Sequence, residues 1–274
     1  MTGALGYERT AVAGSGTIAC GLAAVASTVG QVVLLARSES SAERAGPQID
    51  KLASKLDEAE PGNVKVTTDM ADVETCDLIV EAIVEDPGLK GGLLREVGDR
   101  ARGADLATTT SSLSIGELAD RSGHGDRLFG LHVFNPVPRM ELIELCLPEG
   151  LRPGVAERAK AWCERIGKRA VEVPDQPGFV VNRLLFPYLF DAVRLMESTQ
   201  MAPAEVDECM TLGAGHPMGP LKLLDFVGID VAVAIGHQLR AETGEESHGP
   251  PESLEKLAAE GRTGRKSGRG FYEY

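Results

Sequence analysis

Basic residues are scarce in this sequence. Its 274 residues include 28 Lys and Arg against 41 Asp and Glu, which leaves a formal net charge of −13. Because such an excess of acid repels polyanions, we expect neither nucleic acid nor an anionic membrane surface as a partner, although the overall balance leaves room for a local basic patch.

Cysteine pairs and long apolar runs are also missing. The five cysteines, at positions 20, 76, 146, 163 and 209, form no CxxC pair and no metal-ligand spacing. Such an odd, scattered set predicts reduced, buried thiols and no metal site. The longest apolar stretch, about 179–190, is broken by Asn182, Arg183 and Pro187, which argues against a membrane span. The first ten residues lack the layout of a signal peptide, so we expect a cytoplasmic protein.

The chain has the composition of a folded protein, and strand and helix patterns alternate along it. Hydrophobic residues make up 43% and charged residues 25%, a mixture that supports a buried core. Short apolar runs predict strands at 10–13, 31–35, 64–67, 78–82, 106–109 and 128–133. Helical periodicity falls between them, at 16–29, 39–60, 89–101 and 114–121. This order predicts an α/β fold, a Rossmann-type doubly wound parallel sheet, over residues 1–174.

The pattern changes at the Val-Pro-Asp-Gln-Pro-Gly segment, 173–178. Beyond it the sequence predicts an α-helical domain over 175–274, with helices at 179–199, 203–212, 220–226, 229–242 and 252–260 and a strand only in the C-terminal GFYEY. The helix at 179–199 is apolar almost all round, and Pro187 should kink it. A helix without a polar face needs cover on every side, and in a small domain the expected cover is a second subunit. We therefore predict a homodimer.

A glycine-rich turn follows the first predicted strand and opens the first helix. Its sequence, Gly14-Ser15-Gly16-Thr17-Ile18-Ala19, matches the dinucleotide fingerprint G-x-G-x-x-A. Gly14 permits the tight turn, Gly16 lets backbone N–H groups approach a pyrophosphate, and Ala19 lets the helix pack close to the strand; Thr17 and Ile18 begin that helix. The first domain is therefore expected to bind a dinucleotide.

The end of the second strand bears on which dinucleotide binds. An enzyme that uses NAD usually has an acid here, which binds the ribose 2′-hydroxyl. This chain has Ala36 instead, followed by Arg37 and Ser38. One interpretation is an ordinary surface arginine. Because loss of the acid coincides with gain of the cation, we favour a 2′-phosphate site and expect NADP(H) over NAD(H).

A histidine lies near the end of the strand at 128–133. His132 precedes the rigid turn 134–138, and Glu144 lies on the apolar segment that follows. A histidine at the carboxyl end of such a strand suits proton transfer, and a carboxylate behind it would fix the imidazole tautomer. For His132 alone, a structural or surface role stays open.

Taken together, these segments resemble the L-3-hydroxyacyl-CoA dehydrogenase family, which includes bacterial 3-hydroxybutyryl-CoA dehydrogenases. The resemblance covers nearly the whole chain. Its motifs are GSGTIACG, EAIVED, TSSLSIGELA, GLHVFNPVPRMELIEL, DQPGFVVNRLLFPYL, LGAGHPMGPLKLLDFVGID and GRTGRKSGRGFYEY.

The resemblance implies a role for each matching residue. His132 would be the general base or acid and Glu144 its partner. Ser111 and Asn182 would hydrogen-bond the reacting oxygen. The cofactor side of the site would include Asn135, Glu85 and Lys90. Simpler interpretations stay open for three of them: a helix N-cap for Ser111, a cap of the long helix for Asn182, and a solvated helix face for Lys90.

The chain departs from the family pattern at four places. Ala36 replaces the ribose-binding acid, Ala19 the common third glycine, and Glu141 a frequent lysine near the site mouth. The span between Ala36 and Glu81 is shorter than usual, although it keeps Lys51 and Lys55 on one helical face. In the family this region reaches over the CoA moiety, so the acyl group could ride on CoA or on an acyl carrier protein.

Two further interpretations compete with that of a hydroxyacyl-CoA dehydrogenase. One keeps the chemistry but places it on a carrier protein in a biosynthetic pathway. The other is a non-enzymatic relative, structural or cofactor-sensing, because fold alone does not fix function. The joint presence of Ser111, His132, Glu144 and Asn182 favours an enzyme.

Overall fold

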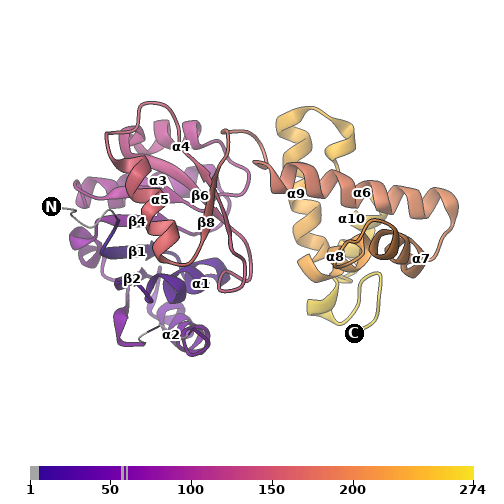
Figure 1. The fold of residues 1–274 in the computed structure, drawn as a ribbon, viewed down its shortest axis with the longest axis horizontal. Helices are drawn as coiled ribbons and strands as arrows, with labels where there is room; N and C mark the ends of the chain where they lie inside the picture. The colour runs from indigo at the N-terminus through magenta and orange to yellow at the C-terminus, as the bar shows by residue number, and fades with distance from the viewer. Residues whose placement is uncertain (1–5, 57–58, 60) are drawn as a thin grey trace. The chain divides into compact units, whose positions relative to one another are not determined.

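The computed structural model describes residues 6–56, 59 and 61–274. The chain divides into two compact units, one that ends at Asp175 and one that runs from Gln176 to Tyr274. The first is an α/β unit and the second is helical (Figure 1).

The α/β unit is built on an eight-stranded sheet with the order β3-β2-β1-β4-β5-β6-β7-β8. Its strands are β1 (Arg9–Ala13), β2 (Gln31–Leu35), β3 (Val64–Thr67), β4 (Leu78–Glu81), β5 (Asp105–Thr108), β6 (Leu128–Val133), β7 (Leu142–Cys146) and β8 (Arg169–Glu172). Strands β1 to β6 run parallel. The order reverses between β1 and β4, and ligands of doubly wound sheets bind outside the carboxyl ends of the strands at such a point.

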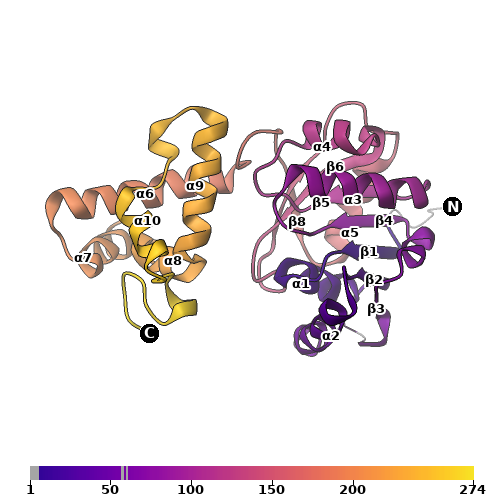
Figure 2. The ribbon, with the colours of Figure 1, turned by 180° about the vertical axis from the view of Figure 1, so that it is seen from behind.

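Helices cover both faces of this sheet (Figures 1 and 2). They are α1 (Thr17–Ala26), α2 (Glu39–Ala53), α3 (Pro87–Arg100), α4 (Ile115–Ser122) and α5 (Val155–Arg165). The central strand β1 shows why. Val12 belongs to the core cluster formed with α1, α2 and α5, whereas Ala11 and Ala13 belong to the cluster formed with α3 and α4. Alternate side chains thus enter opposite cores, as expected for a parallel sheet buried on both faces.

The predicted doubly wound sheet is confirmed, but its last part differs from the prediction. Strand β7 pairs antiparallel with β6, and β8 then pairs parallel with β7. The sequence pattern predicted neither these two strands nor α5. The link between Val133 and Leu142 is too short for a helical crossover, so the chain can only turn back beside β6. The helix predicted at 39–60 ends at Ala53, and residues 57, 58 and 60 lie outside the described part.

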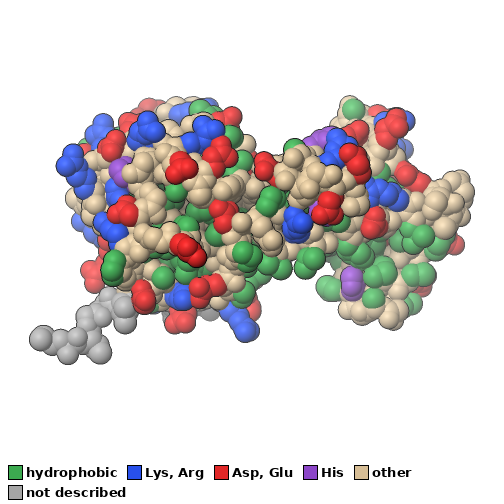
Figure 3. All heavy atoms as spheres, turned by 90° about the horizontal axis from the view of Figure 1, so that it is seen from above, with side chains coloured by type: hydrophobic (Ala, Val, Ile, Leu, Met, Phe, Trp, Pro, Cys, Tyr) green, Lys and Arg blue, Asp and Glu red, His purple; other side chains and the backbone are tan. Residues whose placement is uncertain are grey.

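The second unit contains α6 (Val181–Thr199), α7 (Pro203–Glu208), α8 (Pro220–Val227), α9 (Ile229–Thr243) and α10 (Glu252–Ala259). A short π-helical turn, Cys209–Gly213, extends α7. Inward side chains such as Phe190, Leu224 and Leu254 form one core. Hydrophobic side chains also gather on the surface of this unit (Figure 3). None of the helices in the described residues is long and apolar enough to cross a membrane.

The C-terminal tail corrects the prediction of a strand at GFYEY. Residues 264–274 form a 3-10 turn and two isolated bridges rather than a strand. The reason is a buried carboxylate. Asp225 accepts hydrogen bonds from the backbone N–H groups of Phe271 and Tyr272 at 2.9 Å each, so these groups are not available to a sheet.

The cysteine prediction also needs a correction at one position. Cys20, Cys76, Cys146 and Cys163 are buried free thiols, as expected, but Cys209 is exposed. It lies in the π-helical turn, where no residue is buried.

Candidate active site

The carboxyl ends of the parallel strands bring most of the predicted site residues to one edge of the sheet. Gly14 follows β1, Arg37 follows β2, Glu85 follows β4, and Ser111 follows β5, while His132 is the last but one residue of β6. These residues are up to 118 positions apart in the sequence, but the parallel strands place them at the same edge of the sheet.

The glycine turn has the geometry that a pyrophosphate requires. Gly14 has φ +143°, and a Cβ there would lie 2.2 Å from the carbonyl oxygen of Ala82. At Gly16, the N-cap of α1, a Cβ would meet nothing within 4 Å, so space lies open in front of the helix N-terminus. The first turn of α1, which begins at Thr17 and Ile18, holds no acidic residue. Its N–H groups therefore fit the phosphates of a dinucleotide.

Small side chains let α1 pack closely. Ala19 is fully buried, and a Cβ added to Gly14 would lie 3.5 Å from the Cβ of Ala19. A Cβ on Gly21 would lie 3.0 Å from the Cβ of Val137, in the turn after β6. The third small residue of the fingerprint therefore serves helix packing, as predicted, and Ala19 is tolerated there.

The end of β2 presents a cation and hydroxyls. Ala36 is buried, while Arg37 and Ser38 are exposed. Within the described part of the chain, Arg37 has no ion pair. The Ser38 hydroxyl is the N-cap of α2: it accepts from the Ser41 N–H and lies 2.6 Å from the Ser41 Oγ. The first turn of α2 also holds Glu39, whose carboxylate accepts from the Thr68 hydroxyl.

His132 and Glu144 form a buried dyad. They are direct partners in the antiparallel register of β6 and β7, which brings Nδ1 to 2.7 Å from Oε2. His132 is 5% exposed and Glu144 1%. The Phe134 ring packs against the imidazole with a centroid separation of 4.5 Å. With Nδ1 held by the carboxylate, Nε2 is the nitrogen through which the imidazole would exchange a proton.

Glu85 organises the loop after β5. Its Oε1 accepts from the Thr110 hydroxyl at 2.6 Å, the Ser111 N–H at 2.8 Å, the Ser112 hydroxyl at 2.9 Å and the Ser111 hydroxyl at 3.3 Å. Burial alone would raise the pKa of Glu85, but Lys90 and these hydrogen bonds outweigh it and hold the pKa below its usual range.

Two of the simpler interpretations are wrong for residues near this edge. The N-cap of α4 is Ser114, whose hydroxyl accepts from the Glu117 N–H, so Ser111 does not cap that helix. Lys90 does not lie on a solvated helix face, because it is 1% exposed. Its ammonium lies between two carboxylates, 2.9 Å from Glu81 Oε1 and 3.3 Å from Glu85 Oε2.

Glu81 is the residue that sequence reasoning missed. It is completely buried at the end of β4 and binds Lys90, Thr108 and the Ile83 N–H. The signal available was a glutamate that closes the apolar run LIVE, followed nine residues later by a lysine. A charge at the end of a buried strand needs a partner, and that lysine supplies it.

The two predicted asparagines lie in different units. Asn135 is exposed in the turn after β6 and precedes Pro136 across a cis peptide bond. Asn182 is the second residue of α6 in the helical unit and is 7% exposed. Because Val180 occupies the N-cap position of that helix, a capping role for Asn182 is also wrong.

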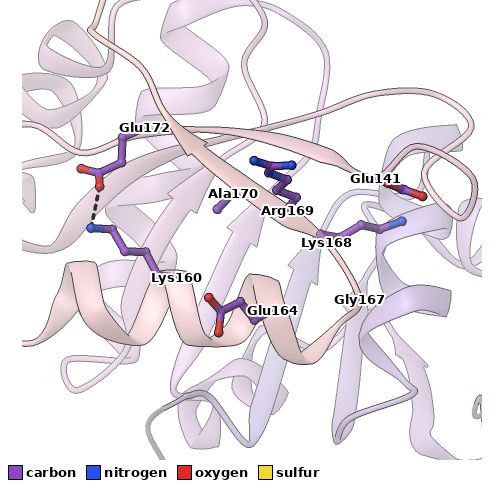
Figure 4. A pocket seen from close by; sticks show the side chains of 8 residues that line it. All are labelled: Glu141, Lys160, Glu164, Gly167, Lys168, Arg169, Ala170 and Glu172. Carbon is purple, nitrogen blue, oxygen red and sulfur yellow. Dashed lines mark ion pairs between the residues drawn. The ribbon is translucent and has the colours of Figure 1, made fainter.

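A concavity of about 570 Å³ on the α/β unit is lined by other side chains (Figure 4). It is lined by Glu141, Lys160, Glu164, Gly167, Lys168, Arg169, Ala170 and Glu172. Three of its charged side chains have partners: Lys160 pairs with Glu172 at 2.6 Å, and Lys168 donates to the Val137 and Met140 carbonyls at 2.7 and 2.8 Å. Lys168 thereby ties the turn that carries Asn135 to the segment just before β8, but none of the predicted catalytic residues lines this concavity.

Comparisons with known proteins agree along nearly the whole chain. The family model described as 3-hydroxyacyl-CoA dehydrogenase, NAD binding domain, matches residues 9–176, and the one described as 3-hydroxyacyl-CoA dehydrogenase, C-terminal domain, matches residues 178–274. A probable 3-hydroxybutyryl-CoA dehydrogenase from Deinococcus radiodurans is 36% identical over 274 residues, which cover 96% of this chain and 99% of that protein.

Two further relatives extend this result to an animal protein and to a solved structure. The human mitochondrial hydroxyacyl-coenzyme A dehydrogenase is 37% identical over 288 residues, covering 97% of this chain and 91% of that protein. The crystal structure of FadB2 from Mycobacterium tuberculosis matches with a TM-score of 0.92 at 35% identity, over 98% of this chain and 99% of that one.

Proposed function

This chain belongs to the 3-hydroxyacyl-CoA dehydrogenase family, and from that membership we propose that it interconverts a 3-hydroxyacyl-CoA thioester, such as 3-hydroxybutyryl-CoA, and its 3-oxo form, with NADP(H) preferred over NAD(H). The observation that carries this proposal is the His132–Glu144 dyad on the sheet edge that also bears the glycine turn. A nicotinamide cofactor, when bound, would accept or supply the hydride.

The protein's own part in the reaction is proton transfer and orientation. In the oxidative direction His132 Nε2 takes the proton of the substrate hydroxyl, and in the reductive direction it returns that proton. The carboxylate of Glu144 holds Nδ1, which fixes the tautomer and stabilises the imidazolium. We assign to Ser111 and Asn182 the hydrogen bonds that stabilise charge on the reacting oxygen, and to Asn135, Glu85 and Lys90 the surroundings of the cofactor.

Turnover of acetoacetyl-CoA tests the proposed function directly. Purified protein should oxidise NADPH in the presence of acetoacetyl-CoA, with a dependence on both concentrations. A protein that binds NADPH but turns over no 3-oxoacyl thioester would instead support the non-enzymatic interpretation.

The preference for NADP(H) rests on the end of β2. An acid at position 36 would repel a 2′-phosphate, and Ala36 removes that repulsion. Arg37 is exposed and can pair with the phosphate, and the Ser38 hydroxyl can donate to it. One charged hydrogen bond is worth about 1.5–3 kcal/mol, which corresponds to roughly 10- to 150-fold in discrimination.

The matched test of this preference is the double variant Ala36→Asp/Arg37→Leu. In the wild type, kcat/KM should be higher with NADPH than with NADH, and the double variant should reverse that order. Equal values in the wild type, or an unchanged ratio in the variant, would remove the case for a phosphate site.

An acyl carrier protein is the alternative source of the thioester. In the described residues between β2 and β3 there is one α-helix, α2, and Lys51 and Lys55 on and just after it are both exposed. Since a short segment offers little surface to the nucleotide part of CoA, we expect weak dependence on the CoA 3′-phosphate. Comparing acetoacetyl-CoA with its 3′-dephospho form measures this, and a large loss of kcat/KM would establish CoA as the recognised carrier.

A further inference from the structure

Three charged side chains, Glu81, Lys90 and Glu85, connect the end of β4 to the loop that carries Ser111. We call this ion-pair network the relay. The Lys90 ammonium lies 2.9 and 3.0 Å from the two carboxylate oxygens of Glu81 and 3.4 Å from the Ile83 carbonyl. Its side chain is 1% exposed and that of Glu81 0%. One cation therefore neutralises the buried Glu81 and reaches Glu85 as well, at 3.3 Å.

Glu81 has a fixed orientation. It is the register partner of Thr108 in the pairing of β4 with β5, and the Thr108 hydroxyl donates to Glu81 Oε2 at 2.6 Å. The Ile83 N–H donates to the other oxygen at 2.7 Å. One donor lies on β5 and the other just after β4, so the Glu81 carboxylate is held in place even without its contact to Lys90.

The loop depends on Glu85 for its shape. Four donors of residues 110–112 converge on Glu85 Oε1, among them the N–H and the hydroxyl of Ser111. The Thr110 hydroxyl, which one of these bonds fixes, in turn accepts from the N–H groups of Ser112 and Leu113 at 3.3 and 2.9 Å. Moving the Glu85 carboxylate would therefore move the whole turn.

We propose that Glu81 is a positioning residue for the dehydrogenase reaction: by anchoring Lys90 it holds Glu85 against the 110–112 turn and so sets the direction of the Ser111 hydroxyl. This inference rests on the proposed function, because it assigns a task to the turn that bears Ser111. Glu81 itself touches neither substrate nor reacting atoms in this scheme. Its role is to fix the positions of Lys90, Glu85 and the Ser111 hydroxyl.

The decisive variant is Glu81→Gln, and the chain offers a matched control. Asp105 is a buried carboxylate on the adjacent strand β5, 2% exposed, with its own hydroxyl and arginine partners, Tyr7 and Arg158. It lies at the amino end of the strand rather than the carboxyl end. Asp105→Asn therefore removes a buried charge of the same kind without touching the relay.

Hydrogen exchange of the protein without ligands gives a readout independent of turnover. The amides of residues 111–113 should exchange faster in Glu81→Gln than in the wild type, whereas Asp105→Asn should leave their rates unchanged even if it lowers Tm. In steady state, kcat and kcat/KM of Glu81→Gln should fall together, by up to about 100-fold, since a misplaced group loses transition-state contacts.

Several results would overturn the proposal. Wild-type exchange at residues 111–113 and wild-type kcat in Glu81→Gln would do so, and so would equal loop loosening in Asp105→Asn. If Glu81→Gln fails to fold, Glu81→Asp carries the test, because it keeps the buried charge but withdraws the carboxylate from Lys90; a smaller change is expected in the same direction, and the absence of any change would contradict the proposal. Lack of turnover in the wild type would refute the proposed function, while the exchange measurement would still judge the relay.

Discussion

At the scale of single residues, the dyad depends on strand register. His132 and Glu144 are 12 positions apart and meet only because β6 and β7 pair antiparallel with these two residues opposite each other. A slip by one residue would turn one of them to the other face of the sheet. The pairing is thus as important to the proposed chemistry as the side chains are.

The first prediction concerns this dyad. His132→Gln should lower kcat by about 10²–10⁴-fold, because it removes the proton-transfer group. Glu144→Gln should lower it less, since the imidazole stays but loses its orienting charge. Affinity for NADPH, measured by fluorescence titration, should remain nearly that of the wild type in both. Glu172→Gln, on the exposed end of β8, serves as the control, and wild-type turnover in His132→Gln would refute the assignment.

A second residue-scale prediction concerns the thiols. Burial raises the pKa of Cys146 and Cys163 to about 12 and that of Cys76 to about 11, and it also raises the pKa of Cys20. These four thiols are therefore protonated at neutral pH and shielded from reagents. Only Cys209 is exposed among the five.

The native protein should accordingly show one fast-reacting thiol with a disulfide reagent such as DTNB and four that react only on unfolding. Cys209→Ser should abolish the fast phase without changing the slow one. Two or more fast thiols in the wild type would mean that the core around the buried cysteines opens readily.

At the scale of elements, the C-terminal tail is held to the helical unit by two carboxylates. Asp225 binds the tail through two N–H groups and the Tyr274 hydroxyl. Asp207 accepts from the Tyr272 hydroxyl at 2.6 Å and from two N–H groups at the start of α8. Gly264 is required for this arrangement, because its φ is +93° and a Cβ there would lie 2.3 Å from the Asp225 carbonyl oxygen.

The third prediction is that this attachment stabilises the helical unit. Asp225→Asn should lower the free energy of unfolding by about 3 kcal/mol, since it weakens several hydrogen bonds to a buried charged group. Tyr274→Phe, which removes only one of them, should cost less. Urea unfolding followed by circular dichroism measures both. Equal stability of Asp225→Asn and the wild type would show that the tail contributes little.

Elements also mark the limit of what the sequence could predict. The glycine turn, the parallel strands and the place of His132 near the end of a strand follow from spacing and periodicity, which are local properties, whereas the role of His132 was implied only by the family resemblance. Strands β7 and β8 could not be predicted in this way, because their alternation of apolar and polar residues is short and includes charged residues. The contact of Glu81 with Lys90 could not be predicted either, because a sequence does not show which charged side chains are buried together. Register and burial are decided by packing between distant segments.

At the scale of the whole molecule, a net charge of −13 and an apolar surface on the helical unit point in different directions. Charge repulsion keeps molecules apart, whereas contiguous apolar surface favours association. On α6, Leu184 is 69% exposed and Leu195 52%, and Phe226 of the neighbouring α8 is 48% exposed. The prediction that this helix lacks a polar face is wrong in part, because Asp191 and Arg194 form an ion pair on its surface, but the helix keeps part of its apolar surface exposed in the single chain.

The last prediction is that this surface is covered by a second copy. Leu184 and Phe226 line an apolar groove of about 490 Å³ together with Tyr188 and His216. Burying such side chains against a partner would release about 25 cal/mol for each Å² of apolar surface. Sedimentation equilibrium at micromolar concentration should then give about twice 29.0 kDa for the wild type. Leu184→Glu should shift the protein toward monomer, because it would place a charge in the interface.

The control separates a specific interface from general stickiness. Leu89, on α3 of the α/β unit, is 57% exposed, so Leu89→Glu adds the same charge at a similarly exposed leucine outside the helical unit. We expect this variant to sediment as the wild type does. A monomeric wild type, or dissociation caused equally by both substitutions, would contradict the dimer. If only Leu184→Glu dissociates, the apolar face of α6 is the contact, and the stability of the helical unit then depends on protein concentration through mass action.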